Sequence, residues 1–347
     1  MWPYWLMFLL PAFTASFSTR VVTGPQRLGW WFILSLFALI IGFRHEVGGD
    51  WGAYLRHFDY VLYYDFGEVI RRSDPGYYTL SWLLADSGWS IYWLNFVCAI
   101  AAMAGVSIFA RRQPLPWLAL TAAVPYLLVV VAMGYTRQAT ALGFVLIGLA
   151  ALGQHKTRQF VFWVIVGATF HKSAVLLLPI AALSATKNKF WTFTWVGVTA
   201  LGAAYFFVVE EADALWTNYV EADYQSQGGL IRVAMNAVPS LLLLLTGDRL
   251  FFTVEERRLW RWMAIFSLLT VPLVTISSTA VDRVALYFIP IQLFTFSRFP
   301  FLMSGVSNRR LLTLAVVLYY GLVLYVWLNY AVNSGYWLPY SNYWLSF

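Results

Sequence analysis

Four cationic side chains are well placed for chemistry, because they interrupt otherwise apolar stretches: Arg44, Arg137, Lys172 and Arg283. A guanidinium binds phosphate through two parallel hydrogen bonds, so arginines that converge on one watery cavity would form an anion site. A charge buried among apolar spans usually faces a cavity or a partner and indicates function. The alternative is that such side chains reach out to lipid headgroups. For Arg56, Arg71 and Arg72 the anion-site and headgroup interpretations are equally open.

Carboxylates and one histidine supply candidate proton acceptors. In the segment 43–54, a Gly-Gly bend separates Arg44 and Glu46 from Asp50, Trp51 and Tyr54. Glycine allows backbone conformations that bring the flanking side chains together. The alternative role of Asp50 is to cap a helix.

Two more candidate proton acceptors lie outside that segment. Asp74, directly before Pro75, has the same alternative role as a helix cap. His171 lies within the sequence Phe170-His171-Lys172-Ser173.

The amino-acid composition predicts the class of protein that positions these groups. Hydrophobic residues make up 61% of the 347 residues, charged residues 11% and aromatic residues 19%, with a net charge of +7. Soluble proteins are roughly a quarter charged, so an ordinary soluble enzyme, a disordered chain and a disulfide scaffold are excluded. Cys98 is the sole cysteine, so no internal disulfide can form. The chain is predicted to be an integral membrane protein.

Runs of apolar residues predict an all-α polytopic fold with 10–12 transmembrane helices, some short or bent, around an outer-face cavity. No linker or repeat divides residues 1–347, which indicates a single transmembrane domain. The N-terminus lacks a basic region, which favours an uncleaved first span over a signal peptide. The predicted runs are 2–18, 28–43, 89–110, 115–133, 138–153, 160–171, 173–186, 190–208, 230–247, 262–276, 284–297 and 311–331.

The distribution of basic residues predicts the orientation, because Lys and Arg are retained on the cytoplasmic side. If the N-terminus is external, 15 of the 23 basic residues fall in cytoplasmic connections, together with three of the 16 acidic residues. The two sides then carry net charges of +12 and −5. External segments would be the loop 44–88, the loop 209–229 and the C-terminal tail 332–347.

Two segments depart from simple spans. Residues 160–186 are too few for two full crossings at 1.5 Å per residue, yet they join basic clusters on one side. We expect a bent pair of short helices that meet at residues 170–173; one long tilted helix is the alternative.

Within the loop 44–88, apolar residues from Tyr54 to Ile70 recur at helical spacing and predict an interfacial amphipathic helix. The apolar patch 77–85 is too short to span.

Other chemistry has weaker support. The acidic loop that contains Glu211, Asp213, Glu221 and Asp223 could in principle bind Mg²⁺ or Ca²⁺, but such loops are usually only solvated. We expect no metal and no cofactor, and the sequence has no nucleotide-binding loop. The basic residues follow membrane sidedness, so nucleic-acid binding has no support.

In sum, several motifs occur in a fixed order, and together they resemble the EpsG family of bacterial exopolysaccharide proteins, which is grouped with Wzy-type polymerases of O-antigen and capsule. The sequence departs from the family pattern at Asp74, where glutamate is usual, and at the additional Glu46. The motifs are Arg44…Gly48-Gly49-Asp50-Trp51…Tyr54, Asp74-Pro75-Gly76-Tyr77, Tyr135-Thr136-Arg137-Gln138, Phe170-His171-Lys172-Ser173-Ala174, Asp282-Arg283-Val284-Ala285-Leu286-Tyr287-Phe288 and Leu338-Pro339-Tyr340.

The resemblance implies a glycosyltransferase of the bacterial inner membrane whose active site faces the periplasm. Wzy-type polymerases move a growing glycan from undecaprenyl pyrophosphate onto the next lipid-linked repeat unit. The implied partners are these lipid-linked oligosaccharides, the lipid bilayer and a chain-length regulator protein.

The resemblance assigns roles to the candidate residues. Arg137 and Arg283 would stabilise charge on the departing pyrophosphate, and Arg44 or Lys172 would hold the second carrier. Asp50, or else His171, would take the acceptor proton. The remaining expected substrate-binding residues are Glu46, Asp74 and Tyr340, with Trp51, Tyr54, Tyr77 and Tyr287 as stacking surfaces for sugars.

Two other functions remain open from the sequence. A flippase or exporter of the same lipid-linked glycan would also use interrupted helices near mid-membrane. An O-antigen ligase would use the same donor and a similar arginine site. Whether the aromatic side chains stack on sugars or only form the interfacial belt also remains open.

Overall fold

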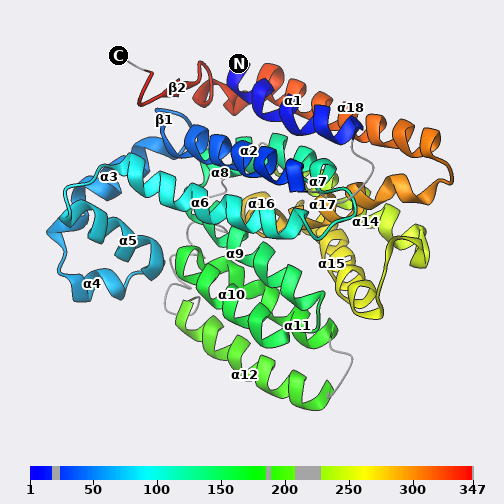
Figure 1. Cartoon of the computed structure of the whole chain (residues 1–347). Coiled ribbons are helices and arrows are strands. Elements are labelled where there is room, and N and C mark those ends of the chain that lie inside the picture. The colour runs from blue at the N-terminus through cyan, green and yellow to red at the C-terminus, as the bar shows by residue number, and fades with distance from the viewer. Residues whose placement is uncertain (18–23, 185–188, 208–227, 346–347) are drawn as a thin grey trace.

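The computed structural model describes residues 1–17, 24–184, 189–207 and 228–345, and in these ranges the chain is an all-α bundle (Figure 1). Its helices run mainly from left to right in this view. The predicted polytopic all-α fold is confirmed, and a helical segment overlaps each of the twelve predicted apolar runs. The long segments are α1 (Trp2–Phe17), α2 (Gly24–Gly42), α6 (Ile91–Ala110), α7 (Pro116–Ala123) continued by η2 (Val124–Val131) and α8 (Ala132–Gly134), α9 (Thr136–Leu152), α10 (Thr157–Phe170), η3 (Lys172–Leu177) with α11 (Leu178–Ser184), α12 (Lys189–Phe207), α14 (Gly229–Leu245), α15 (Val254–Leu273), α16 (Ser278–Ala285), η7 (Leu286–Phe288), α17 (Ile289–Arg298), η8 (Phe299–Leu302) and α18 (Val306–Tyr330).

Four helical stretches in the described ranges are long and apolar enough to cross a membrane: Ile91–Ala110, Pro116–Gly134, Ser278–Leu302 and Val306–Tyr330. The stretch Pro116–Gly134 is wholly buried and packs against α1, α17 and α18, so it forms the centre of the bundle. The stretch Val306–Tyr330 is only 28% buried, as suits a helix whose outer face meets lipid. Several other apolar helices are shorter, and the number of crossings remains a prediction.

The predicted bend in residues 160–186 is confirmed. Helix α10 ends at Phe170, His171 is extended (φ −156°, ψ 111°), and η3 begins at Lys172. Helix α11 packs back against α10, which one continuous helix could not do. The turn at His171 therefore carries its flanking polar residues on non-helical backbone inside the protein.

The predicted amphipathic helix of the loop 44–88 is interrupted. It consists of α3 (Trp51–Tyr60), η1 (Val61–Tyr63) and α4 (Phe66–Ile70), and α5 (Pro75–Asp86) follows. The break occurs because Asp65 and Glu68 form a capping box that starts a new helix. Tyr54, Phe58, Val61 and Val69 are buried as the spacing predicts, whereas Leu55, Leu62, Phe66 and Ile70 are exposed.

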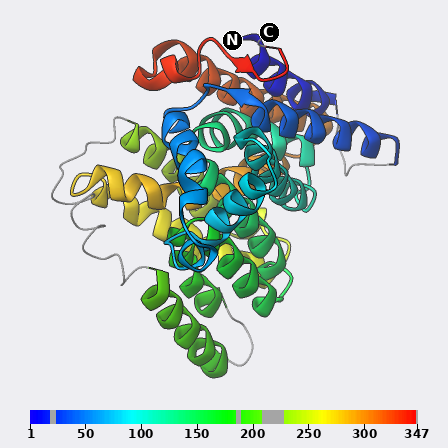
Figure 2. The same ribbon diagram turned by 90° about the vertical axis from the view of Figure 1, so that its left-hand side faces the viewer.

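The C-terminal tail returns to the segment after α2. The strands β1 (Arg44–His45) and β2 (Ser341–Asn342) pair antiparallel, and η9 (Val332–Tyr336) precedes β2. The Gly48 amide donates to the Tyr336 carbonyl at 2.8 Å. The tail and the loop 44–88, both predicted to be external, thus lie at one end of the bundle. Figure 2 views this end, with α3–α5 in front of the bundle.

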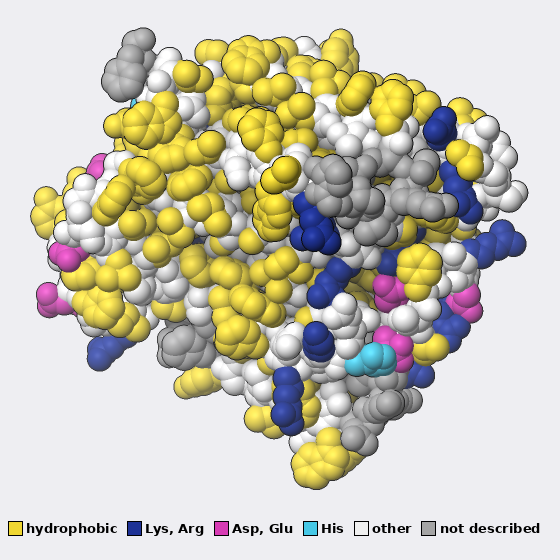
Figure 3. All heavy atoms as spheres, viewed as in Figure 1, with side chains coloured by type: hydrophobic (Ala, Val, Ile, Leu, Met, Phe, Trp, Pro, Cys, Tyr) yellow, Lys and Arg dark blue, Asp and Glu magenta, His cyan; other side chains and the backbone are white. Residues whose placement is uncertain are grey.

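Charged side chains separate along the direction of the helices (Figure 3). Hydrophobic side chains cover the middle of this face, and most basic side chains gather toward the right, where acidic ones lie among them. At the left margin acidic side chains predominate over basic ones. The left margin is the end that carries α3–α5. This distribution agrees with the predicted division into an acidic outer side and a basic cytoplasmic side.

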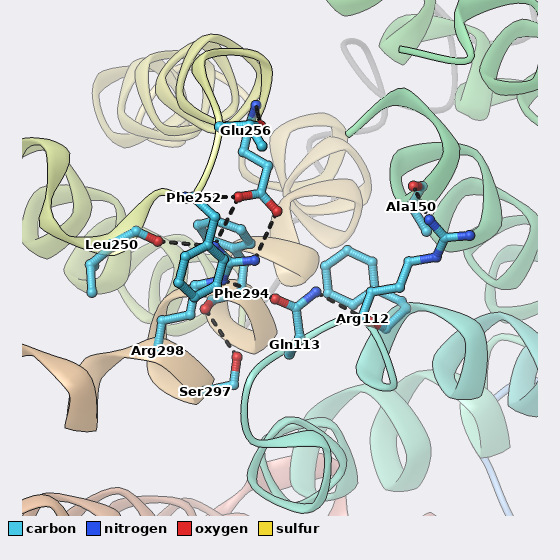
Figure 4. A network of polar contacts seen from close by, with 11 residues as sticks. Arg112, Gln113, Ala150, Leu250, Phe252, Glu256, Phe294, Ser297 and Arg298 are labelled. Atoms are coloured by element: carbon cyan, nitrogen blue, oxygen red, sulfur yellow. Dashed lines mark hydrogen bonds and ion pairs between the residues drawn. The ribbon is translucent and has the colours of Figure 1, made fainter. Parts of the chain in front are cut away.

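A buried ion pair connects three elements at the basic end (Figure 4). Arg298, at the end of α17, is 2% exposed and donates to both carboxylate oxygens of Glu256 at 2.9 and 3.1 Å. It also donates to the Leu250 carbonyl and to the side chain of Gln113. These bonds fasten α15 and α17 to the connection that precedes α7.

Candidate functional site

A group of charged and polar side chains lies at the end covered by α3–α5. We call it the Arg137 cluster, and it consists of Asp50, Asp74, Arg137, His171 and Arg283. Its members come from the start of α3, the start of α5, the start of α9, the turn after α10, and α16. Residues that are far apart in the sequence meet because the interruptions before α9 and after α10 lie at the same end.

Asp74 joins two segments of the cluster. Its Oδ2 accepts a hydrogen bond from Arg137 Nη1 at 2.8 Å, and its Oδ1 accepts one from the Lys172 amide at 3.1 Å. Asp74 occupies the N-cap position of α5 but makes no side-chain capping bond, so the alternative role as a cap does not apply. Burial raises the pKa of Asp74, while the charge of Arg137 opposes this shift. The side chain of Arg137 remains 29% exposed.

Asp50 stands at the N-cap position of α3, again without a side-chain capping bond. Burial raises the pKa of Asp50, and the charges of Arg283 and Arg137 act in the opposite direction. The carboxylate is therefore only partly enclosed and lies within electrostatic reach of both guanidinium groups. Gly48 permits this approach: its φ is 107°, and a Cβ atom there would collide with the Met133 carbonyl.

A hydrogen bond to its backbone holds Arg283 in place and leaves its guanidinium available to a ligand. Gln138 Nε2 donates to the Arg283 carbonyl at 2.8 Å, and the guanidinium lies 4.5 Å from the ring centroid of Tyr135. Among the residues that the structure describes, no carboxylate lies within ion-pair distance of Arg283. An arginine that has no acidic partner there and acts on the same carboxylate as Arg137 is suited to bind an anion.

His171 belongs to a small hydrogen-bonded group. Its Nδ1 lies 2.6 Å from Ser173 Oγ and 3.5 Å from the hydroxyl of Tyr287, and Ser173 Oγ lies 3.2 Å from that hydroxyl. These contacts orient the imidazole ring. The charges of Arg137, Arg283 and Lys172 all act on it, so His171 lies within electrostatic reach of the same two arginines as Asp50.

Arg44 lies differently from the sequence-based expectation. It is 1% exposed, and its guanidinium donates to the carbonyls of Ile41 and Val47 and to Thr136 Oγ1. It therefore ties the end of α2 to the start of α9 and is enclosed, so it does not reach a second lipid carrier in this structure. The backbone carbonyls that enclose it are invisible to reasoning from residue types.

Tyr340 and Glu46 are also outside the cluster. The Tyr340 hydroxyl donates to the Ile40 carbonyl at 2.7 Å and thereby anchors the tail. Glu46 is exposed with a φ of 53°, an uncommon conformation for a residue other than glycine. Lys172, in contrast, is half-exposed, and its side chain lies within electrostatic reach of Asp74 and Arg137.

The four aromatic side chains expected to stack on sugars are buried: Trp51, Tyr54, Tyr77 and Tyr287. Tyr54 and Tyr77 form the wall behind Arg137, whose guanidinium lies 5.8 Å from each ring centroid. Their faces are covered by protein, so this arrangement does not offer them to a sugar ring. Within the described ranges, the Tyr77 hydroxyl has no hydrogen-bond partner.

Several residues that hold predicted site residues in place were not themselves predicted. Ser173, Gln138 and Thr136 hold His171, Arg283 and Arg44 respectively. All three lie within the sequence motifs. Their position next to a charged motif residue was the feature that could have identified them. A second buried pair, Arg232 with Asp282 at 2.6 Å, lies one position from Arg283.

No candidate metal cluster occurs among the described residues. The acidic residues Glu211, Asp213, Glu221 and Asp223 lie outside the described residues, as does nearly all of the predicted external loop 209–229.

A cavity of about 310 Å³ opens next to the Arg137 cluster at the same end of the bundle. None of the predicted site residues lines it. Its walls come from α3, η1, the start of α5 and the loops between them: Ala53, Arg56, His57, Tyr60, Val61, Tyr64, Arg72 and Tyr78.

Comparison with known proteins gives one match. The sequence model of the EpsG family matches residues 28–342, which is nearly the whole chain and includes every member of the Arg137 cluster. Neither a curated protein nor a solved structure matches the chain.

Proposed function

Because the chain belongs to the EpsG family and is thus a membrane protein related to exopolysaccharide biosynthesis, we propose that it polymerises lipid-linked oligosaccharide repeat units. In this reaction the hydroxyl oxygen of the acceptor unit attacks the anomeric carbon of the donor glycan. The bond from that carbon to the pyrophosphate oxygen breaks, and undecaprenyl pyrophosphate leaves with the bonding electrons. The acceptor hydroxyl loses its proton to a base on the protein.

One observation carries the proposal: the Asp50 carboxylate lies within electrostatic reach of Arg137 and Arg283 at the same end of the bundle. The reaction needs cations where the pyrophosphate leaves and a proton acceptor where the hydroxyl attacks. Preorganised charges aimed at the leaving group lower the barrier because negative charge develops there. Arg283 has no acidic partner among the described residues, so its charge is available for this purpose.

The two arginines contribute differently. Arg137 is positioned by Asp74, so the pair presents a fixed donor at little cost in conformational entropy. Asp74 is engaged through both oxygens and therefore acts as a positioning residue and not as the base. Lys172, next to this pair, would contact the pyrophosphate of the second carrier.

Asp50 is the first candidate for the base, since no capping bond occupies its side chain. Burial raises the pKa of Asp50, which makes the carboxylate a better proton acceptor than an exposed one. His171 is the second candidate, because Ser173 orients its imidazole. Burial and the charges of Arg137, Arg283 and Lys172 disfavour protonation of this ring, so it is a weaker proton acceptor than Asp50.

The cellular setting follows from the same proposal. The Arg137 cluster would face the periplasm in the bacterial inner membrane, where lipid-linked units arrive from the bilayer. A chain-length regulator protein would be a partner of the enzyme. The acidic character of this end agrees with the external side of the predicted topology (Figure 3).

Deletion of the gene distinguishes the polymerase from its rivals. Loss of the glycan ladder, with a single repeat unit still attached to the surface, is expected for a polymerase. Complete loss of surface glycan would instead indicate a flippase or a ligase and would contradict the proposal. Purified protein supplied with one defined lipid-linked unit should form the ladder in the absence of other proteins.

A further inference from the structure

The cavity beside the Arg137 cluster has a lining that the polymerase chemistry does not use. Arg56, His57 and Arg72 contribute its polar groups, and Tyr60, Tyr64 and Tyr78 contribute most of its aromatic surface. Its volume of about 310 Å³ is at the small end of the range for ligand sites. A group of a few rings or a single charged sugar would occupy it.

The charge of the lining is positive. No acidic side chain belongs to it, and no carboxylate among the described residues lies within ion-pair distance of Arg56 or Arg72. The acidic residues nearest in sequence do not line it: Asp59 is exposed on α3, and Asp74 bonds to Arg137. Asp65 and Glu68 are occupied by the capping box of α4. Burial, together with the charges of Arg137, Arg72 and Arg56, lowers the pKa of His57, which favours the neutral ring. A neutral imidazole can donate or accept a hydrogen bond.

The aromatic surface of the cavity is accessible. Tyr60 is 58% exposed and Tyr64 is 38% exposed, unlike the enclosed rings behind Arg137. Arg72 lies 3.8 Å from the ring centroid of Tyr64 and 5.3 Å from that of Tyr78, so the rings hold its guanidinium in place. Tyrosine faces beside fixed charged donors are suited to a ring that carries an anionic group.

Side chains in contact connect the cavity to the cluster. Tyr78 lines the cavity, its ring centroid is 5.9 Å from that of Tyr77, and Tyr77 lies beside Arg137. The rings of Tyr78 and Tyr77 thus link the cavity to the Arg137 guanidinium. A glycan whose reducing end reacts at the cluster would pass the cavity with one of its next sugars.

We propose that this cavity binds an acidic sugar of the repeat unit, one whose ring carries a carboxylate, through Arg56 and Arg72. The arginines hold the carboxylate, Tyr60 and Tyr64 contact the sugar ring, and His57 bonds to a hydroxyl. The inference rests on the proposed function and names its substrate class: the polymerised glycan is anionic. The competing occupant is an anionic lipid headgroup, because α3 was expected to lie at the membrane interface.

A binding experiment without turnover tests the inference. Full-length protein in phosphatidylcholine nanodiscs is titrated with a tetragalacturonate, and with the same tetrasaccharide after its carboxylates are reduced to alcohols. The variants are the double substitution R56Q/R72Q, the charge-preserving R56K/R72K, and R71Q as matched control. Arg71 is an exposed neighbour of Arg72 on the same loop but does not line the cavity.

We expect R56Q/R72Q to bind the tetragalacturonate about tenfold more weakly, since each charge-assisted hydrogen bond contributes to affinity. R56K/R72K should retain part of the affinity, and R71Q should change it by less than about twofold. The reduced tetrasaccharide should bind weakly and equally to all variants. Unchanged elution of each variant in size-exclusion chromatography shows that it is folded.

Three results would overturn the inference: equal binding of the charged and reduced sugars, an equal loss in R71Q, or displacement of the sugar when phosphatidylglycerol is added to the nanodiscs. The last would identify a lipid headgroup site. Chain extension is measured separately, so failure of the polymerase proposal appears as an unaltered ladder on gene deletion. Failure of the inference appears in the binding assay alone.

Discussion

Arg137 Nη1 lies 2.8 Å from the Oδ2 of Asp74, and this pair joins positions 63 residues apart in the sequence. The carboxylate is almost fully buried, while the guanidinium remains partly exposed. The buried partner therefore fixes the orientation of the exposed one. An arginine held in this way can meet an anion without first losing the freedom of its long side chain.

Substitution Asp74→Ala tests this positioning. Without the carboxylate, Arg137 loses its orientation, and we expect chain extension to slow by about 10–100-fold, because misplacement of a catalytic group by about 1 Å is enough for such a loss. The rate is measured with purified protein and a defined lipid-linked unit. Asp86→Ala is the matched control, since Asp86 is exposed at the other end of α5. Equal rates in the two variants would contradict the role of Asp74.

The identity of the base can be read from the pH dependence. Only the deprotonated Asp50 accepts a proton, and burial raises its pKa above the ordinary value of 3.8. The value of kcat/KM should therefore fall as the pH is lowered through that raised pKa. Asp50→Asn should slow chain extension by at least about 100-fold and remove this acidic limb. If the limb persists in Asp50→Asn and vanishes in His171→Gln, the imidazole is the base.

In the proposed reaction Arg283 interacts with charge that develops on the leaving group, so it should contribute to the rate more than to substrate affinity. We expect Arg283→Ala to lower kcat by about 100-fold. Arg283→Lys should recover part of the rate, since lysine keeps the charge but lacks the forked geometry. Arg310→Ala, an exposed change at the other end, is the control. A rise in KM with kcat unchanged would show that Arg283 only binds the substrate.

The ion pair at the basic end should stabilise the fold without affecting chemistry. Glu256→Ala leaves the buried Arg298 without its acidic partner, and breaking such a pair costs about 3 kcal/mol. Glu255→Ala removes a pair with the half-exposed His155 and should cost less than about 1 kcal/mol. Thermal unfolding in detergent measures both changes. Similar Tm values for the two variants would show that the buried pair contributes little.

The orientation can be tested with single cysteines. Cys98 is buried and is the sole cysteine of the sequence, so Cys98→Ala provides the background. On it, we expect an impermeant maleimide to label Arg71→Cys and Lys172→Cys from outside intact cells. Arg310→Cys, near the start of α18 and so at the end of that helix away from the C-terminal tail, should react only after the membrane is opened. Labelling of position 172 only from the cytoplasm would reverse the predicted topology.

The helices were largely predictable because a lipid environment demands long apolar runs. The exceptions have local causes. Helix α15 begins at Val254, eight residues before the predicted run, because its first turns are charged and Thr253 caps them through the Glu256 amide. The predicted amphipathic helix breaks at Asp65 because a capping box forms there, and the spacing of hydrophobic residues gives no sign of a capping box.

The residues of the site could be predicted better than their arrangement in space. The scarcity of charge singled out Arg137, Arg283 and Asp50, and the fold brings these three together. The same criterion selected Arg44, which the backbone encloses. The two cases differ only in which chain segments surround them, and no pattern of residue types contains that information. For the same reason the cavity lined by Arg56 and Arg72 was not foreseen.

The return of the C-terminal tail to β1 affects the order of assembly during protein synthesis. Tyr340 bonds to the carbonyl of Ile40, 300 positions earlier, and Tyr4 bonds to the carbonyl of Trp337. The ribosome releases the N-terminal helices long before these partners exist. The loop that carries Asp50 thus acquires its final support only when almost the whole polypeptide has entered the bilayer. For the proposed polymerase, we therefore expect the site to be complete only after the C-terminal tail has been translated.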